Sequence, residues 1–171
     1  RSKISERNIK TLQEAAEKGI YIVLSTGRIL KSALYYSKSL ESINFIIACN
    51  GAIISPRYGQ DIIYEKAIEM GSIKKIIELA ESSGIYYHFY GKDTLYSKVI
   101  DESIIKYYKS YEDSLGKQGI KFKVLRDPMA FLKNREAKIY KFVFIEDDRD
   151  KLLDFRQRLK DIEKINISSS W

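Results

Sequence analysis

Two short segments of the chain carry residue types that bind an anion. Thr26-Gly27-Arg28 places a hydroxyl, a glycine and a guanidinium in succession, and Asn50-Gly51 follows further along. A strand that ends at a small hydroxyl residue, turns on a glycine and begins a helix beside an arginine leaves backbone N–H groups and a cation facing one point. The first segment therefore predicts an anion-binding corner.

Hydrophobic spacing predicts the elements that hold these segments. Residues 6–18 have a helical pattern, and Ser5 is placed to cap that helix. Residues 20–24 are all apolar, which is typical of a strand covered on both faces in a parallel sheet. A helical pattern over 30–40 and a short apolar run at 45–48 complete a strand, helix, strand unit.

This unit is expected to bring the two polar segments together. A right-handed crossover makes its two strands parallel, so both carboxyl ends open at the same edge of the sheet. Neighbouring strands lie about 4.8 Å apart, which places Thr26 and Asn50 within reach of one small ligand. A simpler alternative remains open. Thr26 and Gly27 can form a helix-capping turn, Arg28 a surface ion pair, and Asn50-Gly51 a tight turn with left-handed backbone.

From Ala52 the pattern changes to short strands with turns, interrupted by further helices. Helical patterns begin at Ser72 and Asp101 and include Leu152, whereas strand patterns cover 53–54, 61–64, 85–90, 95–96, 120–124, 139–145 and 165–167. The sequence therefore predicts a partial α/β core at residues 1–55 and an α+β module at residues 56–171.

Composition narrows the classes of partner. The chain has 171 residues, of which 44% are hydrophobic and 31% charged, as in a globular protein. Its apolar runs are too short to cross a bilayer and no signal-peptide pattern is seen, so we expect a cytoplasmic location and no membrane partner. The net charge of +7 comes from scattered basic residues, which argues against a nucleic-acid partner.

The single cysteine and the single histidine exclude two kinds of site. Cys49 and His88 can form neither an internal disulfide nor a familiar zinc site, and we expect Cys49 to be a buried residue at a strand end. Strand alternation places His88 on one face with Tyr86 and Tyr90. That face could contact a sugar or another leaving group, although a packed, hydrogen-bonded histidine is the interpretation we favour.

The early segments, taken in order, resemble the Cof-type branch of the haloacid dehalogenase superfamily. The resemblance rests on Ile4-Ser5, Gly19-Ile20, Val23-Leu24-Ser25-Thr26-Gly27-Arg28 and Asn50-Gly51-Ala52-Ile53-Ile54. It implies a Rossmann-like core with an inserted C2-type α+β cap, and the activity of a magnesium-dependent phosphatase. By this resemblance Thr26 would be catalytic, binding the transferring phosphoryl group, while Arg28 and Asn50 with their neighbours Gly27 and Gly51 would line the substrate cleft.

The reactive motifs of that family have no match in this chain. Its nucleophile and general acid lie in an Asp-x-Asp-Gly-Thr segment, and its later lysine and acidic magnesium motif are missing too. Asp148 and Asp150 form an Asp-x-Asp after a strand, but Gly-Thr does not follow, and helix capping explains them better.

The resemblance therefore implies an internal fragment of a phosphatase that hydrolyses small phosphate esters, such as sugar phosphates, through a phosphoaspartate. The nucleophile and the Mg²⁺ ligands would lie outside this chain, which alone is expected to be inactive. The alternative is a noncatalytic module that binds a ligand or nucleic acid. A dinucleotide-dependent oxidoreductase is disfavoured because no glycine-rich fingerprint follows either early strand.

Overall fold

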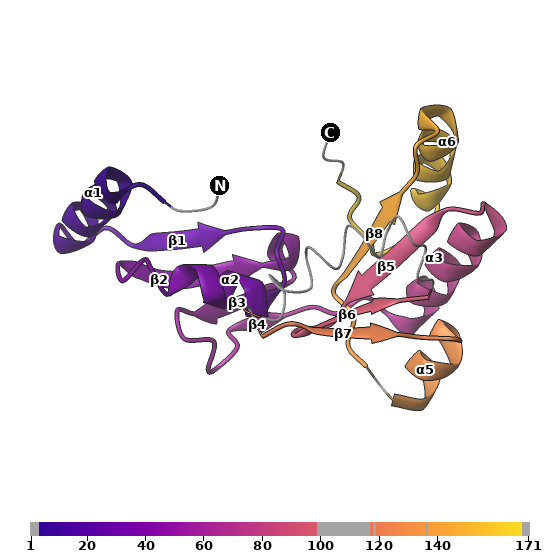
Figure 1. Ribbon diagram of the computed structural model, residues 1–171, viewed down its shortest axis with the longest axis horizontal. Helices are drawn as coiled ribbons and strands as arrows, with labels where there is room; N and C mark the ends of the chain where they lie inside the picture. The colour runs from indigo at the N-terminus through magenta and orange to yellow at the C-terminus, as the bar shows by residue number, and fades with distance from the viewer. Residues whose placement is uncertain (1–3, 99–116, 118, 136, 169–171) are drawn as a thin grey trace. The chain divides into compact units, whose positions relative to one another are not determined.

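A computed structural model describes residues 4–98, 117, 119–135 and 137–168 (Figure 1). The chain forms two compact units, Arg1–Lys66 with Ser114–Ile120 and Ala67–Asp113 with Lys121–Trp171. Each unit contains its own four-stranded sheet. In the described part of the chain no helix is both long and apolar enough to span a membrane.

The first unit begins with the predicted strand, helix, strand arrangement. Its elements in chain order are α1 (Glu6–Glu17), β1 (Ile22–Ser25), α2 (Leu30–Ser37), β2 (Ile43–Ala48), the 3-10 turn η1 (Cys49–Gly51), β3 (Ile53–Pro56) and β4 (Tyr64–Glu65). The sheet order is β1-β2-β3-β4, with β1 and β2 parallel and the remaining pairs antiparallel. The parallel pair confirms that the carboxyl ends of β1 and β2 open at the same edge.

Both ends of α1 have the capping residues that its sequence indicates. The Ser5 hydroxyl accepts a hydrogen bond from the backbone N–H of Asn8 at 3.3 Å. At the other end Gly19 has φ +80°, and its N–H donates to the carbonyl of Ala16 while the next N–H donates to the carbonyl of Ala15. This paired arrangement is a Schellman motif, which satisfies carbonyl groups that the helix end leaves free.

β1 is more exposed than its apolar run predicts. Ile20, Tyr21 and Val23 have exposed fractions of 56%, 73% and 44%, and α1 contributes no buried residue. β1 lies at the edge of the described sheet, where β2 is its only strand neighbour among the described residues. The expectation of a strand covered on both faces is therefore wrong for this structure, because an apolar run does not tell which elements pack against it.

The first sheet continues past the boundary expected after residue 55. β3 pairs with β2, β4 pairs with β3, and the N–H of Ile63 donates to the carbonyl of Ile54 at 2.9 Å. These backbone hydrogen bonds keep the short strands in the first unit, and the two units divide between Lys66 and Ala67. The strands expected to open the second module thus complete the first sheet.

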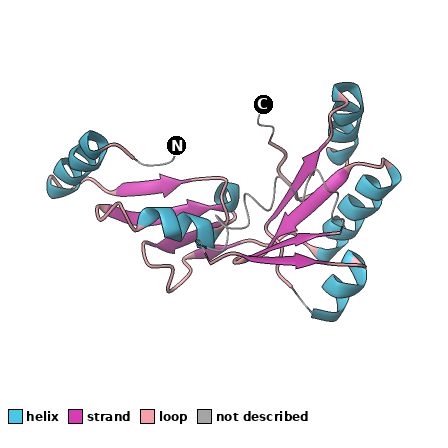
Figure 2. Ribbon diagram, in the orientation of Figure 1, coloured by secondary structure: helices cyan, strands magenta, loops and turns pink. Residues whose placement is uncertain are grey.

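The second unit packs helices against one face of a mixed sheet. Its elements are α3 (Met70–Ser82), β5 (Tyr86–Tyr90), β6 (Thr94–Ser97), β7 (Lys121–Val124), α5 (Pro128–Arg135), β8 (Lys141–Ile145) and α6 (Arg149–Leu159). The strand order is β7-β6-β5-β8, in which β5 is antiparallel to both neighbours and β6 is parallel to β7. Figure 2 shows α3, α5 and α6 on the same side of this sheet.

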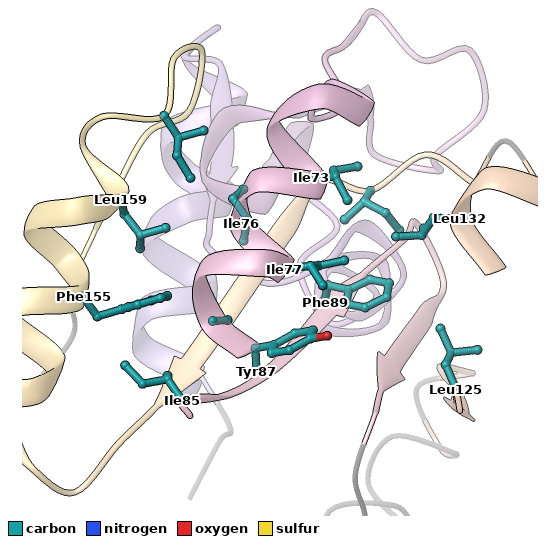
Figure 3. Close-up of a cluster of buried hydrophobic side chains, with 13 residues drawn as sticks. Ile73, Ile76, Ile77, Ile85, Tyr87, Phe89, Leu125, Leu132, Phe155 and Leu159 are labelled. Atoms are coloured by element: carbon teal, nitrogen blue, oxygen red, sulfur yellow. The ribbon is translucent and has the colours of Figure 1, made fainter. Parts of the chain in front are cut away.

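Alternation along β5 separates a core face from a polar face. Tyr87 and Phe89 point into a cluster formed with buried residues of α3, α5 and α6 (Figure 3). Phe89 is fully buried, which contributes about 1.5–3 kcal/mol relative to an exposed ring. Tyr86, His88 and Tyr90 consequently lie on the opposite face, as the sequence predicts.

Two segments of the second unit differ from the sequence prediction. Residues 165–167 form no strand; Ile165 and Ile167 instead pack, partly buried, against the hydrophobic core. Residues after Asp127 form the helix α5, for which no helical pattern was predicted, and the Asp127 carboxylate accepts from the N–H of Ala130 at 2.9 Å. A capping aspartate followed by proline is a helix-start signal. The helix predicted from Asp101 lies outside the described residues.

Candidate anion-binding site

Backbone hydrogen bonds tie the loop after β1 to the turn after β2. The N–H of Thr26 donates to the carbonyl of Ile47 at 2.9 Å, and the N–H of Asn50 donates to the carbonyl of Thr26 at 3.3 Å. A third bond runs from the N–H of Cys49 to the carbonyl of Arg28 at 2.8 Å. The two polar segments therefore meet at the carboxyl edge of the parallel strand pair, as strand order predicts.

Thr26 has a structural role at this corner. Its hydroxyl oxygen accepts a hydrogen bond from the backbone N–H of Arg28 at 3.2 Å, which forms the local turn proposed as the simpler alternative. A hydroxyl has one donor hydrogen and two acceptor lone pairs, so accepting this bond leaves the hydrogen able to donate. The same side chain can therefore stabilise the turn and donate to an anion.

The backbone N–H groups at the corner are less available than the sequence predicts. The N–H of Thr26 is bonded to β2 and the N–H of Arg28 to the Thr26 hydroxyl. These two groups do not face a shared anion position, because the loop uses them to pair with the sheet and to close its own turn. The Thr26 and Arg28 N–H groups therefore do not serve as anion donors, whereas their side chains remain able to.

Arg28 is exposed and stacks on an aromatic ring. Its guanidinium carbon lies 4.7 Å from the centre of the Tyr36 ring, in the second turn of α2. Within the described part of the chain Arg28 forms no ion pair, so the surface ion pair of the simpler alternative is not found there. The sequence patterns did not predict this contact, although an aromatic residue in the helix that follows Arg28 is a signal for it.

The turn after β2 has left-handed backbone at three successive residues. Cys49, Asn50 and Gly51 have φ values of +52°, +55° and +97°. Glycine and asparagine tolerate this region, whereas cysteine does so at a cost. Cys49 is 3% exposed, and its backbone N–H donates a hydrogen bond to the carbonyl of Arg28. Burial and this hydrogen bond stabilise the strained conformation. The turn leaves Asn50 exposed beside Thr26, and Cys49 is the buried strand-end residue that was predicted.

The corner supplies donors and positive charge. Thr26 offers a hydroxyl, Arg28 a guanidinium and Asn50 a side-chain amide. Across the residues that the structure describes, no group of three or more histidine, cysteine, aspartate or glutamate side chains could hold a metal ion. Magnesium prefers carboxylate and other oxygen ligands, so these residues do not fit the ion that the family resemblance implies. These three side chains offer the donors and the positive charge that suit an anion, and none of them is a carboxylate.

His88 lies in the second unit and is packed within its strand. Its ring is 3% exposed, and Nε2 lies 3.0 Å from the hydroxyl oxygen of Tyr90. Burial, followed by the nearby charge of Lys141, lowers the pKa of His88 to about 4, so the ring is neutral at neutral pH. So little exposed surface supports the packed, hydrogen-bonded interpretation over contact with a substrate.

The Asp-x-Asp segment after β8 is a helix cap. The Asp148 carboxylate accepts from the backbone N–H groups of Asp150 and Lys151 at 3.0 and 3.1 Å, at the start of α6. Glu146 pairs with Lys151, which lowers the pKa of the Glu146 carboxyl. The capping interpretation is confirmed, and this segment is not a substitute for the missing nucleophile.

The chain belongs to the family of haloacid dehalogenase-like hydrolases, whose pattern residues 1–171 match. Two Bacillus subtilis proteins are similar to it, both named 5-amino-6-(5-phospho-D-ribitylamino)uracil phosphatase. YcsE is 43% identical over 51 residues, which cover 30% of this chain and 20% of YcsE. YitU is 27% identical over 84 residues, which cover 48% of this chain and 31% of YitU.

Solved structures of the same family share the fold. A haloacid dehalogenase-like hydrolase from Bacillus subtilis matches with a TM-score of 0.78 and 20% identity, over 98% of this chain and 64% of that protein. One from Bacteroides thetaiotaomicron matches with a TM-score of 0.74 and 23% identity, over 99% and 62%. The subclass IIB sugar phosphatase BT4131 matches with a TM-score of 0.71 and 20% identity, over 99% and 60%.

These matches confirm the resemblance to Cof-type phosphatases and the α/β fold class, a Rossmann-like core with a cap. The chain spans less than two thirds of the length of each of these relatives. The activities in their names thus belong to longer polypeptides.

Proposed function

We propose that this chain provides the phosphate-binding wall of a phosphatase that hydrolyses small phosphate esters. The observation that carries the proposal is the hydrogen-bonded junction of two loops, which groups Thr26, Arg28 and Asn50 at one sheet edge. Phosphoryl transfer spreads negative charge over several oxygens, so positioned donors and a cation stabilise it. Membership of the hydrolase family supports this reading of the corner.

Each side chain has a separate part in the proposed site. The Thr26 hydroxyl donates to a phosphoryl oxygen while its oxygen retains the bond from the N–H of Arg28. The Arg28 guanidinium offsets the oxygen charge, and a guanidinium can bind two oxygens at once. The Asn50 amide donates to the substrate from the facing turn. Attack on phosphorus requires a carboxylate, and we place that aspartate on a segment outside these 171 residues.

The substrate class proposed is a phosphorylated sugar or sugar alcohol. Two relatives are named for a phosphoribityl compound and a structural relative is a sugar phosphatase. The second unit would select among such substrates as a cap. Magnesium, which the resemblance implies, would be bound by segments outside this chain and would polarise the phosphoryl group.

Turnover of p-nitrophenyl phosphate tests the proposal in two proteins, this chain and the same chain within a polypeptide that includes the family's aspartate motif. We expect turnover only from the longer protein. Thr26→Val should lower kcat/KM of the longer protein by about a hundredfold or more, as for loss of a transition-state donor. Thr11→Val is the matched control, because that hydroxyl donates to the carbonyl of Arg7 in exposed α1.

Two results would contradict the proposal. Turnover by this chain alone that Thr26→Val abolishes would show that its own residues supply the nucleophile. Full activity of the longer protein after Thr26→Val would show that the Thr26 hydroxyl does not bind the phosphoryl group. Tight, salt-sensitive binding of short oligonucleotides by an inactive longer protein would support the noncatalytic module instead.

A further inference from the structure

The contact between Arg28 and Tyr36 joins the proposed phosphate wall to α2. The guanidinium carbon lies 4.7 Å from the ring centre, within the range of a cation–π interaction. Tyr36 is half-buried, whereas Arg28 is exposed. Packing against the protein therefore restricts the Tyr36 ring, and the ring contacts the exposed Arg28 side chain.

Helix geometry explains how a residue eight positions later reaches Arg28. Side chains of an α-helix lean toward its N-terminus, and positions four apart lie one above the other. A side chain at Tyr36 that leans toward the N-terminus of α2 can therefore approach Arg28, which agrees with the observed contact. Leu30 and Ala33 are buried and hold this helix against the sheet, so the direction of the ring is set by the core.

Stacking on a ring has a different consequence from pairing with a carboxylate. A carboxylate would neutralise the guanidinium and occupy its N–H groups, whereas a ring accepts no conventional hydrogen bond and leaves the charge in place. The N–H groups, which lie in the guanidinium plane, stay available to two oxygens of one anion. In the described part of the chain Arg28 has the ring and no acidic partner.

We propose that Tyr36 is a positioning residue that orients the Arg28 guanidinium for the phosphate group of the substrate. This role rests on the proposed function of the corner and adds to it a residue that touches no substrate. The aromatic ring, rather than the phenolic hydroxyl, provides the effect. Replacing tyrosine by phenylalanine should therefore preserve it, and replacing it by an aliphatic residue should not.

Titration of this chain with inorganic phosphate tests the role, with calorimetry for affinity and the Arg28 Nε–H resonance for geometry. Tyr36→Leu should raise Kd about two- to fivefold, the range for loss of an exposed cation–π contact. It should also abolish the upfield ring-current shift of the Arg28 resonance. Tyr36→Phe should change neither. The matched control is Tyr58→Leu, which removes the ring 5.1 Å from Arg57 and should leave phosphate affinity unchanged.

The outcomes separate this role from the function on which it rests. If the unchanged chain binds phosphate and Tyr36→Leu binds it equally well, the positioning role is wrong. The proposal that the corner binds phosphate is then unaffected. If the unchanged chain binds no phosphate, the proposed function fails, and the positioning role fails with it. An amide spectrum checks that each variant is folded. Tyr36→Met, which keeps the length without a ring, replaces Tyr36→Leu if that variant unfolds.

Discussion

The buried histidine of β5 determines how the stability of the second unit should depend on pH. Burial lowers the pKa of His88 to about 4 in the folded chain, against about 6.5 for an exposed histidine. Between these values the unfolded chain binds a proton that the folded chain does not. The free energy of unfolding should therefore be highest above pH 6.5 and fall as the pH drops toward 4.

The size of the effect follows from the two pKa values. The change from 6.5 to about 4 corresponds to about 3 kcal/mol, which is lost in full only when the pH is below both pKa values. The slope should approach about 1.4 kcal/mol per pH unit within the window. This is a large fraction of the stability of a typical domain. A hydrogen bond from Lys98 lowers the pKa of the Glu81 carboxyl, so the stability that this carboxylate contributes is lost only toward the acid end of the histidine window and below it.

Urea unfolding followed by circular dichroism at pH 7, 6 and 5 would measure this dependence. His88→Gln is the control, because glutamine can still hydrogen-bond to Tyr90 but does not titrate. We expect the unchanged chain to lose stability from pH 6 to 5 and the variant to lose much less. Equal slopes in the two proteins, or a flat response of the unchanged chain, would refute the burial argument for His88.

Three substitutions test other parts of the structure. Phe89→Ala should lower the free energy of unfolding by about 3–5 kcal/mol in urea, because the ring is fully buried in the second core; a loss below 1 kcal/mol would contradict that packing. Asp148→Ala should cost about 1 kcal/mol through the lost α6 cap, with phosphate affinity unchanged in calorimetry. Gly51→Ala should destabilise the chain by about 1–3 kcal/mol and weaken phosphate binding, because alanine is strained at a φ of +97°. An added Cβ meets no atom within 4 Å, so a steric clash does not contribute. A neutral effect would show that the turn relaxes.

Local patterns predicted the first part of the fold because each signal there acts over short distances. The Ser5 cap, the glycine that ends α1 and the parallel pairing of β1 with β2 all follow from neighbouring residues. The same patterns could not show which sheet a short strand joins. Residues 53–65 read as alternating strands in any sheet, and only hydrogen bonds to β2 assign them to the first unit.

Burial was harder to predict, since it depends on elements far away in the sequence. The apolar run of β1 indicated cover on both faces, yet Tyr21 is 73% exposed at the sheet edge. Alternation gave the correct face for His88, and its burial agrees with the packed, hydrogen-bonded interpretation that was favoured. Residues 165–167 show strand-like alternation and instead pack against the hydrophobic core.

The candidate site shows a similar division. Strand order predicted that Thr26 and Asn50 would meet, because parallel strands share an edge. It did not predict that the Thr26 hydroxyl closes its own turn, which depends on loop geometry. The stacking of Tyr36 on Arg28 depends on where α2 begins, and the sequence set that start only approximately.

A crystal structure of this chain with tungstate, a heavy phosphate analogue located by its anomalous signal, tests the phosphate wall most directly. We expect tungstate beside the loop junction, with oxygens about 2.7–3.2 Å from the Thr26 hydroxyl and the Arg28 guanidinium. Arg28→Met should remove it, whereas Arg57→Met should not. Tungstate bound only at other lysine or arginine side chains, with the corner empty, would contradict the assignment of this corner to phosphate.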